Sequence, residues 1–273
     1  MPLSAKTTRA QLSILKPLLG SASLKTIRKC QNKIGELMEF RQMGQIIVRE
    51  HDFSRFKGAW VIPKDERRQG VILYLHGGGF TCGDLEYSIG VATLLAVQTG
   101  TRVFCCAYRL APEHPYPAAP DDVLEAYRYL LDKGYDASHI TLCGESAGGG
   151  LCYTLCLRLR ELGLPLPCGI IAISPWTDLT ASGESYKVNR DTDPSMTEEL
   201  LNFFADSYTK DRDDPMVSPL LADLTGMPPS LIFVGGDEIM RSDAEEMHKR
   251  LLSAGCKSQL ITAPERCHAY VLY

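Results

Sequence analysis

The segment Gly144-Glu145-Ser146-Ala147-Gly148 carries the residue types that nucleophilic attack on a carbonyl requires. One apolar run precedes this segment and another follows it, so the expected order is buried strand, tight turn, helix. The pattern Gly-x-Ser-x-Gly predicts a nucleophile elbow with Ser146 at a strained apex, where only small neighbours fit. The helix that follows directs its N-terminal amides at the negative charge that develops during attack. Because the pattern is short, a glycine-rich turn that merely contains a serine is the alternative.

A run of three glycines after another apolar stretch, residues 71–75, predicts the second part of such a site. The apolar stretch is typical of a strand that is buried on both faces. Consecutive glycines cost chain entropy, but they let backbone N–H groups point at a ligand. We therefore predict an oxyanion hole formed by the N–H groups of Gly78 and Gly79, together with that of Ala147. The remaining residues of the two segments are expected to support the site structurally: His76, Gly77, Gly144, Glu145 and Gly148.

Candidates for an acid and a base follow the last two predicted strands, the buried strand 230–234 and a further strand 257–262. The carboxyl ends of parallel strands meet at one edge of a sheet, where sites in α/β proteins are built. These candidates follow the serine in the chain order Ser146, Asp237, His268, which is the order Ser…Asp…His of one class of hydrolases. We therefore assign His268 as the base and Asp237 as the acid that orients it. Glu238 is the alternative acid, and a helix N-cap is the structural alternative for Asp237.

Composition restricts the class of protein. The 273 residues are 45% hydrophobic and 23% charged, which suits one domain with a sizeable insertion. A net charge of −4 argues against nucleic acid or an anionic membrane as partner. Ten scattered cysteines, several in apolar runs and none with metal-binding spacing, predict reduced thiols. Because the sequence contains no signal-peptide core and no run that spans a membrane, we expect a cytoplasmic protein.

The pattern of apolar residues divides the chain into three parts. Residues 1–44 favour amphipathic helices, which we interpret as the N-terminal part of a helical cap. Residues 45–177 and 216–273 alternate strands with helices, which predicts a core with a parallel sheet. Residues 178–215 are more polar and contain one clear helix, 198–208, so they are interpreted as an insertion that completes the cap.

Taken together, these motifs resemble the hormone-sensitive-lipase-like, or family IV, esterases of bacteria, which belong to the α/β-hydrolase superfamily. The resemblance runs from about Tyr74 to the C-terminus and includes His-Gly-Gly-Gly-Phe, Gly-Glu-Ser-Ala-Gly-Gly, Ser-Pro-Trp-Thr-Asp, Gly-Gly-Asp-Glu and the final His-Ala-Tyr. It implies an α/β-hydrolase fold with an eight-stranded, mostly parallel sheet flanked by helices and a mostly helical cap. The implied activity is hydrolysis of small-molecule carboxylic esters with short or medium acyl chains, through an acyl-enzyme and without a metal or cofactor.

The resemblance also sets expectations about assembly and about rival functions. Family members often pair through edge strands, so the resemblance makes a homodimer one possible assembly. They usually continue past the histidine into a final helix, whereas this sequence ends at Tyr273. We therefore expect a partner subunit to cover the exposed surface, or stability to suffer. Hydrolysis of amides, thioesters or sugar acetates stays open. A non-catalytic receptor on the same fold is a further alternative, which the presence of Ser146, Asp237 and His268 disfavours.

Overall fold

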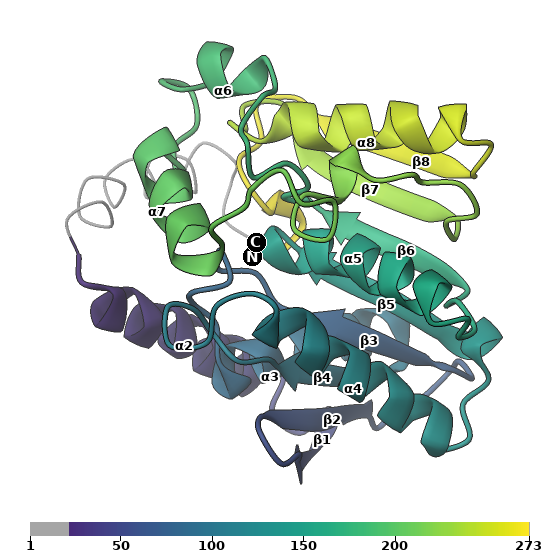
Figure 1. Ribbon diagram of the computed structural model, residues 1–273. Coiled ribbons are helices and arrows are strands. Elements are labelled where there is room, and N and C mark those ends of the chain that lie inside the picture. The colour runs from purple at the N-terminus through teal and green to yellow at the C-terminus, as the bar shows by residue number, and fades with distance from the viewer. Residues whose placement is uncertain (1–21, 273) are drawn as a thin grey trace.

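Eight strands form one central sheet in the computed structural model, which describes residues 22–272 (Figure 1). The strand order is β1-β2-β4-β3-β5-β6-β7-β8. β1 and β2 are antiparallel to each other, β2 is antiparallel to β4, and all other neighbours are parallel. The predicted eight-stranded, mostly parallel sheet is therefore confirmed. The strands are β1 Ile46–Asp52, β2 Lys57–Pro63, β3 Val71–Leu75, β4 Arg102–Ala107, β5 Ile140–Glu145, β6 Gly169–Ile173, β7 Ser230–Gly235 and β8 Ser258–Ala263.

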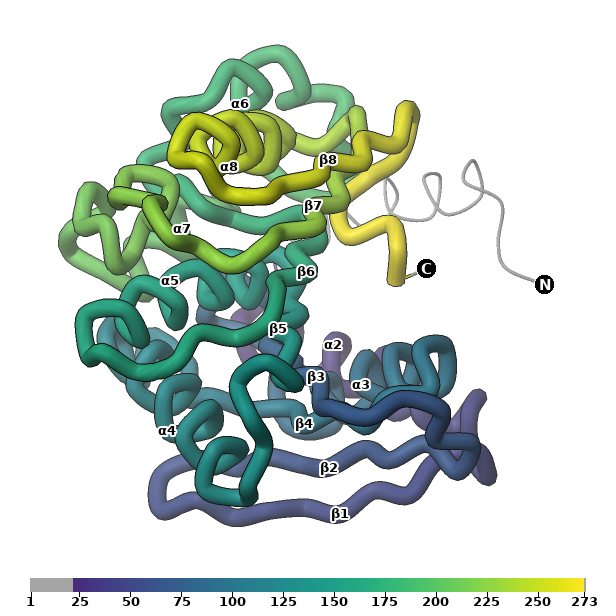
Figure 2. The backbone as a smooth tube through the Cα atoms, turned by 90° about the vertical axis from the view of Figure 1, so that its right-hand side faces the viewer, coloured from purple at the N-terminus to yellow at the C-terminus, as the bar shows by residue number. Residues whose placement is uncertain are grey.

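Helices cover both faces of the sheet, as expected for parallel strands joined by crossover helices. Figure 2 shows α4, α5 and α8 on one face, and α3 with α2 on the other. Within residues 22–272, no helix combines the length and the apolar character needed to cross a membrane. The helices are α2 Leu24–Arg41, α3 Leu85–Thr99, α4 Ala118–Asp132, α5 Ala147–Glu161, α6 Ser185–Val188, α7 Glu198–Tyr208 and α8 Arg241–Ser253, with short 3₁₀ turns at Ala137–His139, Pro219–Leu221 and Tyr270–Leu272.

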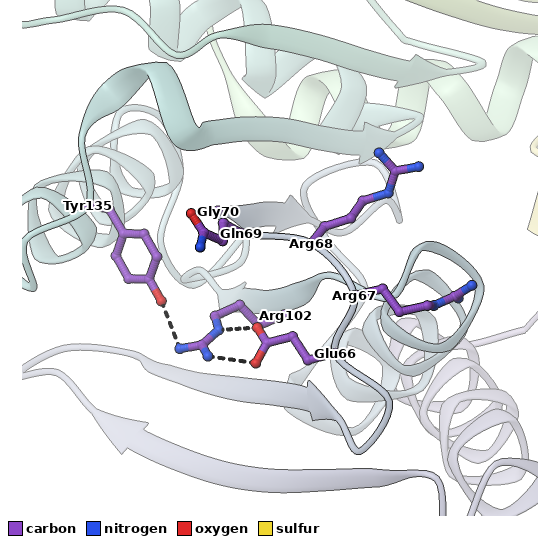
Figure 3. A pocket seen from close by; sticks show the side chains of 7 residues that line it. All are labelled: Glu66, Arg67, Arg68, Gln69, Gly70, Arg102 and Tyr135. Atoms are coloured by element: carbon purple, nitrogen blue, oxygen red, sulfur yellow. Dashed lines mark hydrogen bonds and ion pairs between the residues drawn. The ribbon is translucent and has the colours of Figure 1, made fainter.

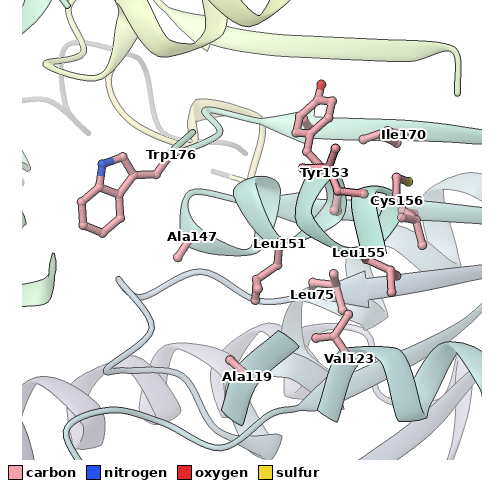
Figure 4. Close-up of a cluster of buried hydrophobic side chains, with 14 of the residues drawn as sticks. Leu75, Ala119, Val123, Ala147, Leu151, Tyr153, Leu155, Cys156, Ile170 and Trp176 are labelled. Carbon is pink, nitrogen blue, oxygen red and sulfur yellow. The ribbon is translucent and has the colours of Figure 1, made fainter. Parts of the chain in front are cut away.

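The core on the α5 side holds the elbow helix against the sheet. In Figure 4, Leu151 and Leu155 of α5 point toward Val123 of α4 and Leu75 of β3. Val123 and Leu75 are completely buried, and Leu151 and Leu155 are at most 2% exposed. Removing a leucine side chain from water contributes about 2 kcal/mol to stability. The start of α5, which carries the nucleophile turn, is therefore fixed by packing along the rest of the helix.

The N-terminal helix α2 packs on α3 through two facing glycines. A Cβ atom on Gly35 would lie 2.4 Å from the Glu86 carbonyl oxygen, and one on Gly90 would lie 2.4 Å from the Gly35 carbonyl oxygen. The two helices therefore approach closely, as small residues allow. Residues 1–21 of the predicted N-terminal cap part lie outside the described residues. The division into cap and core stays a prediction.

The insertion, residues 178–215, contains α6 and α7 and lies at the end of the sheet from which α5 starts (Figure 1). Helix α7 contacts the glycine loop that follows β3: a Cβ atom on Gly79 would lie 2.3 Å from Cδ2 of Phe204. The ring of Phe80 stacks on Tyr208 with centroids 3.8 Å apart. This part of the insertion therefore covers the edge of the sheet where the predicted site residues gather.

Candidate active site

Ser146 occupies a strained turn between β5 and α5. Its backbone angles are φ 54° and ψ −123°, a conformation that costs a non-glycine residue about 1–3 kcal/mol. Hydrogen bonds to the end of β6 and the loop after it hold the turn: the Ser146 N–H donates to the Ile173 carbonyl at 2.9 Å, and the Ser146 carbonyl accepts from the Trp176 N–H at 2.9 Å. A Cβ atom on Gly144 would lie 2.4 Å from the Gly148 carbonyl oxygen. These features are those that the sequence predicts for a nucleophile elbow.

The loop after β3 presents free backbone donors beside this turn. Gly78 has φ +113° and Gly79 has φ +61°, and a Cβ atom on Gly78 would lie 2.4 Å from the Cys82 carbonyl oxygen. Within residues 22–272, the N–H groups of Gly78, Gly79 and Ala147 have no protein acceptor. The Gly77 N–H, by contrast, donates to Glu145 Oε1 at 2.7 Å. The geometry therefore supports Gly78, Gly79 and Ala147 as oxyanion donors and Gly77 as a support.

A buried carboxyl group anchors the glycine loop to the elbow. Besides the Gly77 N–H, Glu145 accepts the hydroxyls of Tyr74 at 2.7 Å and of Tyr87 at 3.1 Å. Burial raises the pKa of Glu145 from 4.5 to about 7. Because its oxygens face three donors from the surrounding structure, Glu145 fixes the loop and does not project toward a substrate.

His76 also supports the loop. Its ring stacks on Tyr108 with centroids 4.0 Å apart, and its Nδ1 lies 2.8 Å from the Gly77 carbonyl oxygen, so Nδ1 carries the proton. Burial lowers the pKa of His76 to about 4, which keeps the ring neutral near pH 7. The Tyr108 hydroxyl donates to the His76 carbonyl at 2.7 Å. These contacts favour the structural role that we expect for His76 over proton transfer.

The carboxylate beside the predicted base belongs to Glu238 and not to Asp237. Glu238 is fully buried, and its Oε2 lies 3.0 Å from Nδ1 of His268. Asp237 is partly exposed, and its backbone N–H donates to the Arg266 carbonyl at 3.1 Å. The loop after β7 thus turns residue 238 inward, toward the segment after β8. The geometry therefore replaces Asp237 by Glu238, the alternative from the sequence, as the residue that orients His268.

The Glu238 carboxylate is held on its other side as well. Oε1 accepts from the Ser174 hydroxyl at 2.6 Å and from the Gly235 N–H at 2.5 Å. Ser174 Oγ in turn accepts the Ala269 N–H at 2.9 Å, so one hydroxyl joins the acid to the segment that carries His268. Sequence reasoning missed Ser174. Two signals point to it: it opens the motif Ser-Pro-Trp-Thr-Asp, and it directly follows β6 at the same sheet edge as the other site residues.

The electrostatics of His268 suit a general base. Burial disfavours the charged ring, but the hydrogen bond and negative charge of Glu238 outweigh this and raise the pKa of His268 above 6.5. In the described residues, no hydrogen bond joins His268 to the Ser146 hydroxyl. Such bonds are often long in unliganded sites and tighten when substrate binds. Ser146 follows β5 and His268 follows β8, so both lie at the carboxyl edge of the sheet.

A cavity of about 420 Å³ lies at the opposite edge, beside the starts of β3 and β4 (Figure 3). There, Arg102 donates to both carboxylate oxygens of Glu66, at 2.6 and 2.7 Å, and to the Tyr135 hydroxyl at 3.1 Å. None of the described residues that line the cavity is a serine or a histidine. The Glu66 and Arg102 side chains are engaged in an ion pair, so among the described residues this cavity offers no nucleophile of the kind predicted at Ser146. It is lined by Glu66, Arg67, Arg68, Gln69, Gly70, Arg102 and Tyr135.

Comparison with known proteins identifies the family of the chain. A family model described as alpha/beta hydrolase fold matches residues 72–272, so the chain belongs to the α/β-hydrolase family. The chain is 36% identical over 217 residues to an acetyl-hydrolase of Streptomyces hygroscopicus, an alignment that covers 78% of this chain and 72% of the relative. It is 37% identical over 190 residues to an esterase of Acinetobacter venetianus, covering 68% of this chain and 63% of the relative.

Solved structures identify the group within the α/β-hydrolase family to which the chain belongs. The crystal structure of an esterase from the bacterial hormone-sensitive lipase family has a TM-score of 0.89 and 33% identity, and the match covers 100% of this chain and 92% of that one. EstE5, which was soaked with p-nitrophenyl butyrate, has a TM-score of 0.89 and 31% identity with the same coverage. The chain is therefore a carboxylesterase of the hormone-sensitive-lipase-like group. The resemblance, the fold and the enzyme class that the sequence predicts are confirmed.

Proposed function

We propose that the protein hydrolyses carboxylic esters with short or medium acyl chains through an acyl-enzyme on Ser146. The observation that carries this proposal is the buried His268–Glu238 pair at the sheet edge where Ser146 occupies its strained turn. The backbone N–H groups of Gly78, Gly79 and Ala147, which have no acceptor among residues 22–272, support it by providing sites for an oxyanion.

A residue of the site is then available to carry out each step of the proposed reaction. His268 Nε2 takes the Ser146 proton as Oγ attacks the carbonyl carbon, while the Glu238 carboxylate accepts a hydrogen bond from Nδ1–H and stabilises the imidazolium. The three N–H groups stabilise the oxyanion, and the intermediate collapses when His268 protonates the departing alcohol. Water then attacks the acyl group, giving its proton to His268. Collapse releases the carboxylic acid and restores the Ser146 hydroxyl.

The preference for shorter acyl chains is supported by the aromatic side chains next to the glycine loop. Phe204 of α7 lies against Gly79, and Phe80 stacks on Tyr208. These rings occupy space beside the oxyanion donors. The Streptomyces relative is named an acetyl-hydrolase, which agrees with a small acyl group. We include α7 and its flanking segment in the proposed cap because they lie over the loop that binds the oxyanion.

The test is hydrolysis of p-nitrophenyl esters from acetate to palmitate by wild type and Ser146→Ala side by side. Loss of the nucleophile should lower kcat on the order of a millionfold, as in a well-studied serine protease. Wild type should be fastest on acetate or butyrate. Equal rates for the two proteins would contradict the acyl-enzyme, and a maximum at palmitate would contradict the proposed chain length.

A further inference from the structure

The backbone around Glu238 is held by side chains of the insertion. The Asn189 side-chain amide donates to the Gly236 carbonyl at 3.1 Å and to the Glu238 carbonyl at 2.7 Å. Asp193 Oδ2 accepts the Ile239 N–H at 2.9 Å. These hydrogen bonds hold the backbone of Glu238 itself and the backbone on both sides of it. They come from a segment more than 40 residues earlier in the chain.

Asn189 and Asp193 are themselves fixed within one short turn. The Asn189 carbonyl accepts the N–H groups of Thr192 at 3.1 Å and of Asp193 at 2.9 Å. Asp193 Oδ1 accepts from the Ser195 N–H and hydroxyl, both at 2.8 Å, and from the Met196 N–H at 3.0 Å. Both side chains are buried, with 7% and 1% of their surface exposed. Because buried polar groups are costly to leave unpaired, this turn and the loop after β7 are strongly coupled.

We propose that Asn189 and Asp193 are positioning residues that hold Glu238 in hydrogen-bonding distance of His268, so the insertion completes the triad. This inference rests on the proposed function. Glu238 must meet His268 Nδ1 while its other oxygen stays on Ser174 and Gly235, which leaves little freedom for its backbone. A misplacement of about 1 Å in a catalytic site lowers the rate on the order of a hundredfold.

Asp193 has a second effect through its charge. Next to the contribution of Glu238, the negative charge of Asp193 favours the protonated ring and helps to raise the pKa of His268. Replacement by asparagine keeps the size of the side chain but removes this charge. Substitutions at the two positions therefore change different things. Asn189 fixes the backbone of Glu238, whereas Asp193 fixes the backbone next to Glu238 and also contributes negative charge near His268.

The test compares Asn189→Ala and Asp193→Asn with Arg190→Ala. The control residue is exposed, lies in the same segment and forms a surface ion pair with Glu198. On p-nitrophenyl acetate, Asn189→Ala should lose about tenfold to a hundredfold in kcat with KM within about threefold. Asp193→Asn should move the acid limb of kcat/KM to lower pH, and Arg190→Ala should match wild type. Rates are taken below each variant's unfolding temperature.

A spectroscopic readout separates positioning from stability. The proton on His268 Nδ1, hydrogen-bonded to Glu238, should give a low-field ¹H resonance in wild type and Arg190→Ala that is lost or broadened in Asn189→Ala. If Asn189→Ala does not fold, the near-isosteric Asp193→Asn carries the test alone. Wild-type kcat, pH profile and resonance in a variant that is only less stable would overturn the inference. Activity retained by Ser146→Ala in the same assay would instead contradict the proposed function.

Discussion

Replacing Glu238 by glutamine tests which carboxylate serves His268. The Oε1 position receives the Gly235 N–H, a donor that cannot turn around, so the glutamine carbonyl should occupy it. The amide nitrogen then faces His268 Nδ1. This forces Nδ1 to accept and places the ring proton on Nε2, the atom that must take the Ser146 proton. Glu238→Gln thereby holds the base in the wrong tautomer without emptying the site.

The size of the effect follows from that tautomer. The equivalent change of acid to amide in a serine protease lowers kcat about 10⁴-fold, which is ~5 kcal/mol of transition-state stabilisation. Asp237→Asn is the matched control, because it makes the same chemical change one residue earlier at a partly exposed site. We expect it to alter kcat by less than about threefold, or ~0.6 kcal/mol.

The assay is the initial rate of p-nitrophenyl acetate hydrolysis, with Ser146→Ala as the floor and thermal unfolding as a check on folding. Glu238→Gln should fall close to the floor while Asp237→Asn stays near wild type. The reasoning is refuted if Asp237→Asn loses about 10⁴-fold and Glu238→Gln remains within tenfold of wild type. That result would restore Asp237 as the acid.

Three further outcomes follow from the same contacts. Gly78→Ala should lower kcat about a hundredfold or more, because the new Cβ atom would lie 2.4 Å from the Cys82 carbonyl oxygen. Gly134→Ala is the control: this glycine also has a positive φ, +90°, but open space surrounds it, so the variant should keep wild-type kcat in the same rate assay. Since Glu238 raises the pKa of His268, kcat/KM of wild type should fall as pH drops through a value above 6.5, and a pH profile with its limb below 6.5 would contradict this. Burial raises the pKa of Glu145 to about 7, so the unfolded chain releases this proton at lower pH than the folded protein does. The unfolding free energy of wild type should therefore fall by up to about 3 kcal/mol as pH rises from 4.5 to 7. Urea titrations of Glu145→Gln should lack this fall, and the same dependence of unfolding free energy on pH in both proteins would refute the prediction.

The sequence predicts the sheet closely because its central strands are continuous apolar runs. Residues 71–75 form β3 with the expected bounds, and the predicted strand 230–234 lies within β7. Their parallel neighbours bury both faces, which is the condition that such runs indicate. The short helix α6 was not predicted. Its four residues are too few to show a helical period, and contacts with α8 determine its place.

The elbow and the glycine loop are also readable from sequence, because their geometry is local. Ser146, Gly78 and Gly79 need unusual backbone angles, and glycine at fixed spacing signals them. The acid is different. Asp237 and Glu238 are adjacent carboxylates, and which of them turns inward depends on bonds from Asn189, Asp193 and Ser174. No spacing rule records these long-range contacts.

Covalent labelling tests the central claim most directly. Wild type is treated with phenylmethylsulfonyl fluoride, and the modified residue is located by peptide mass mapping while esterase activity is followed. The account predicts one sulfonyl group per chain, on Ser146, with activity lost in proportion to labelling, and no labelling of Ser146→Ala. A fully active enzyme with Ser146 sulfonylated, or a folded and active enzyme that is labelled elsewhere, would contradict it.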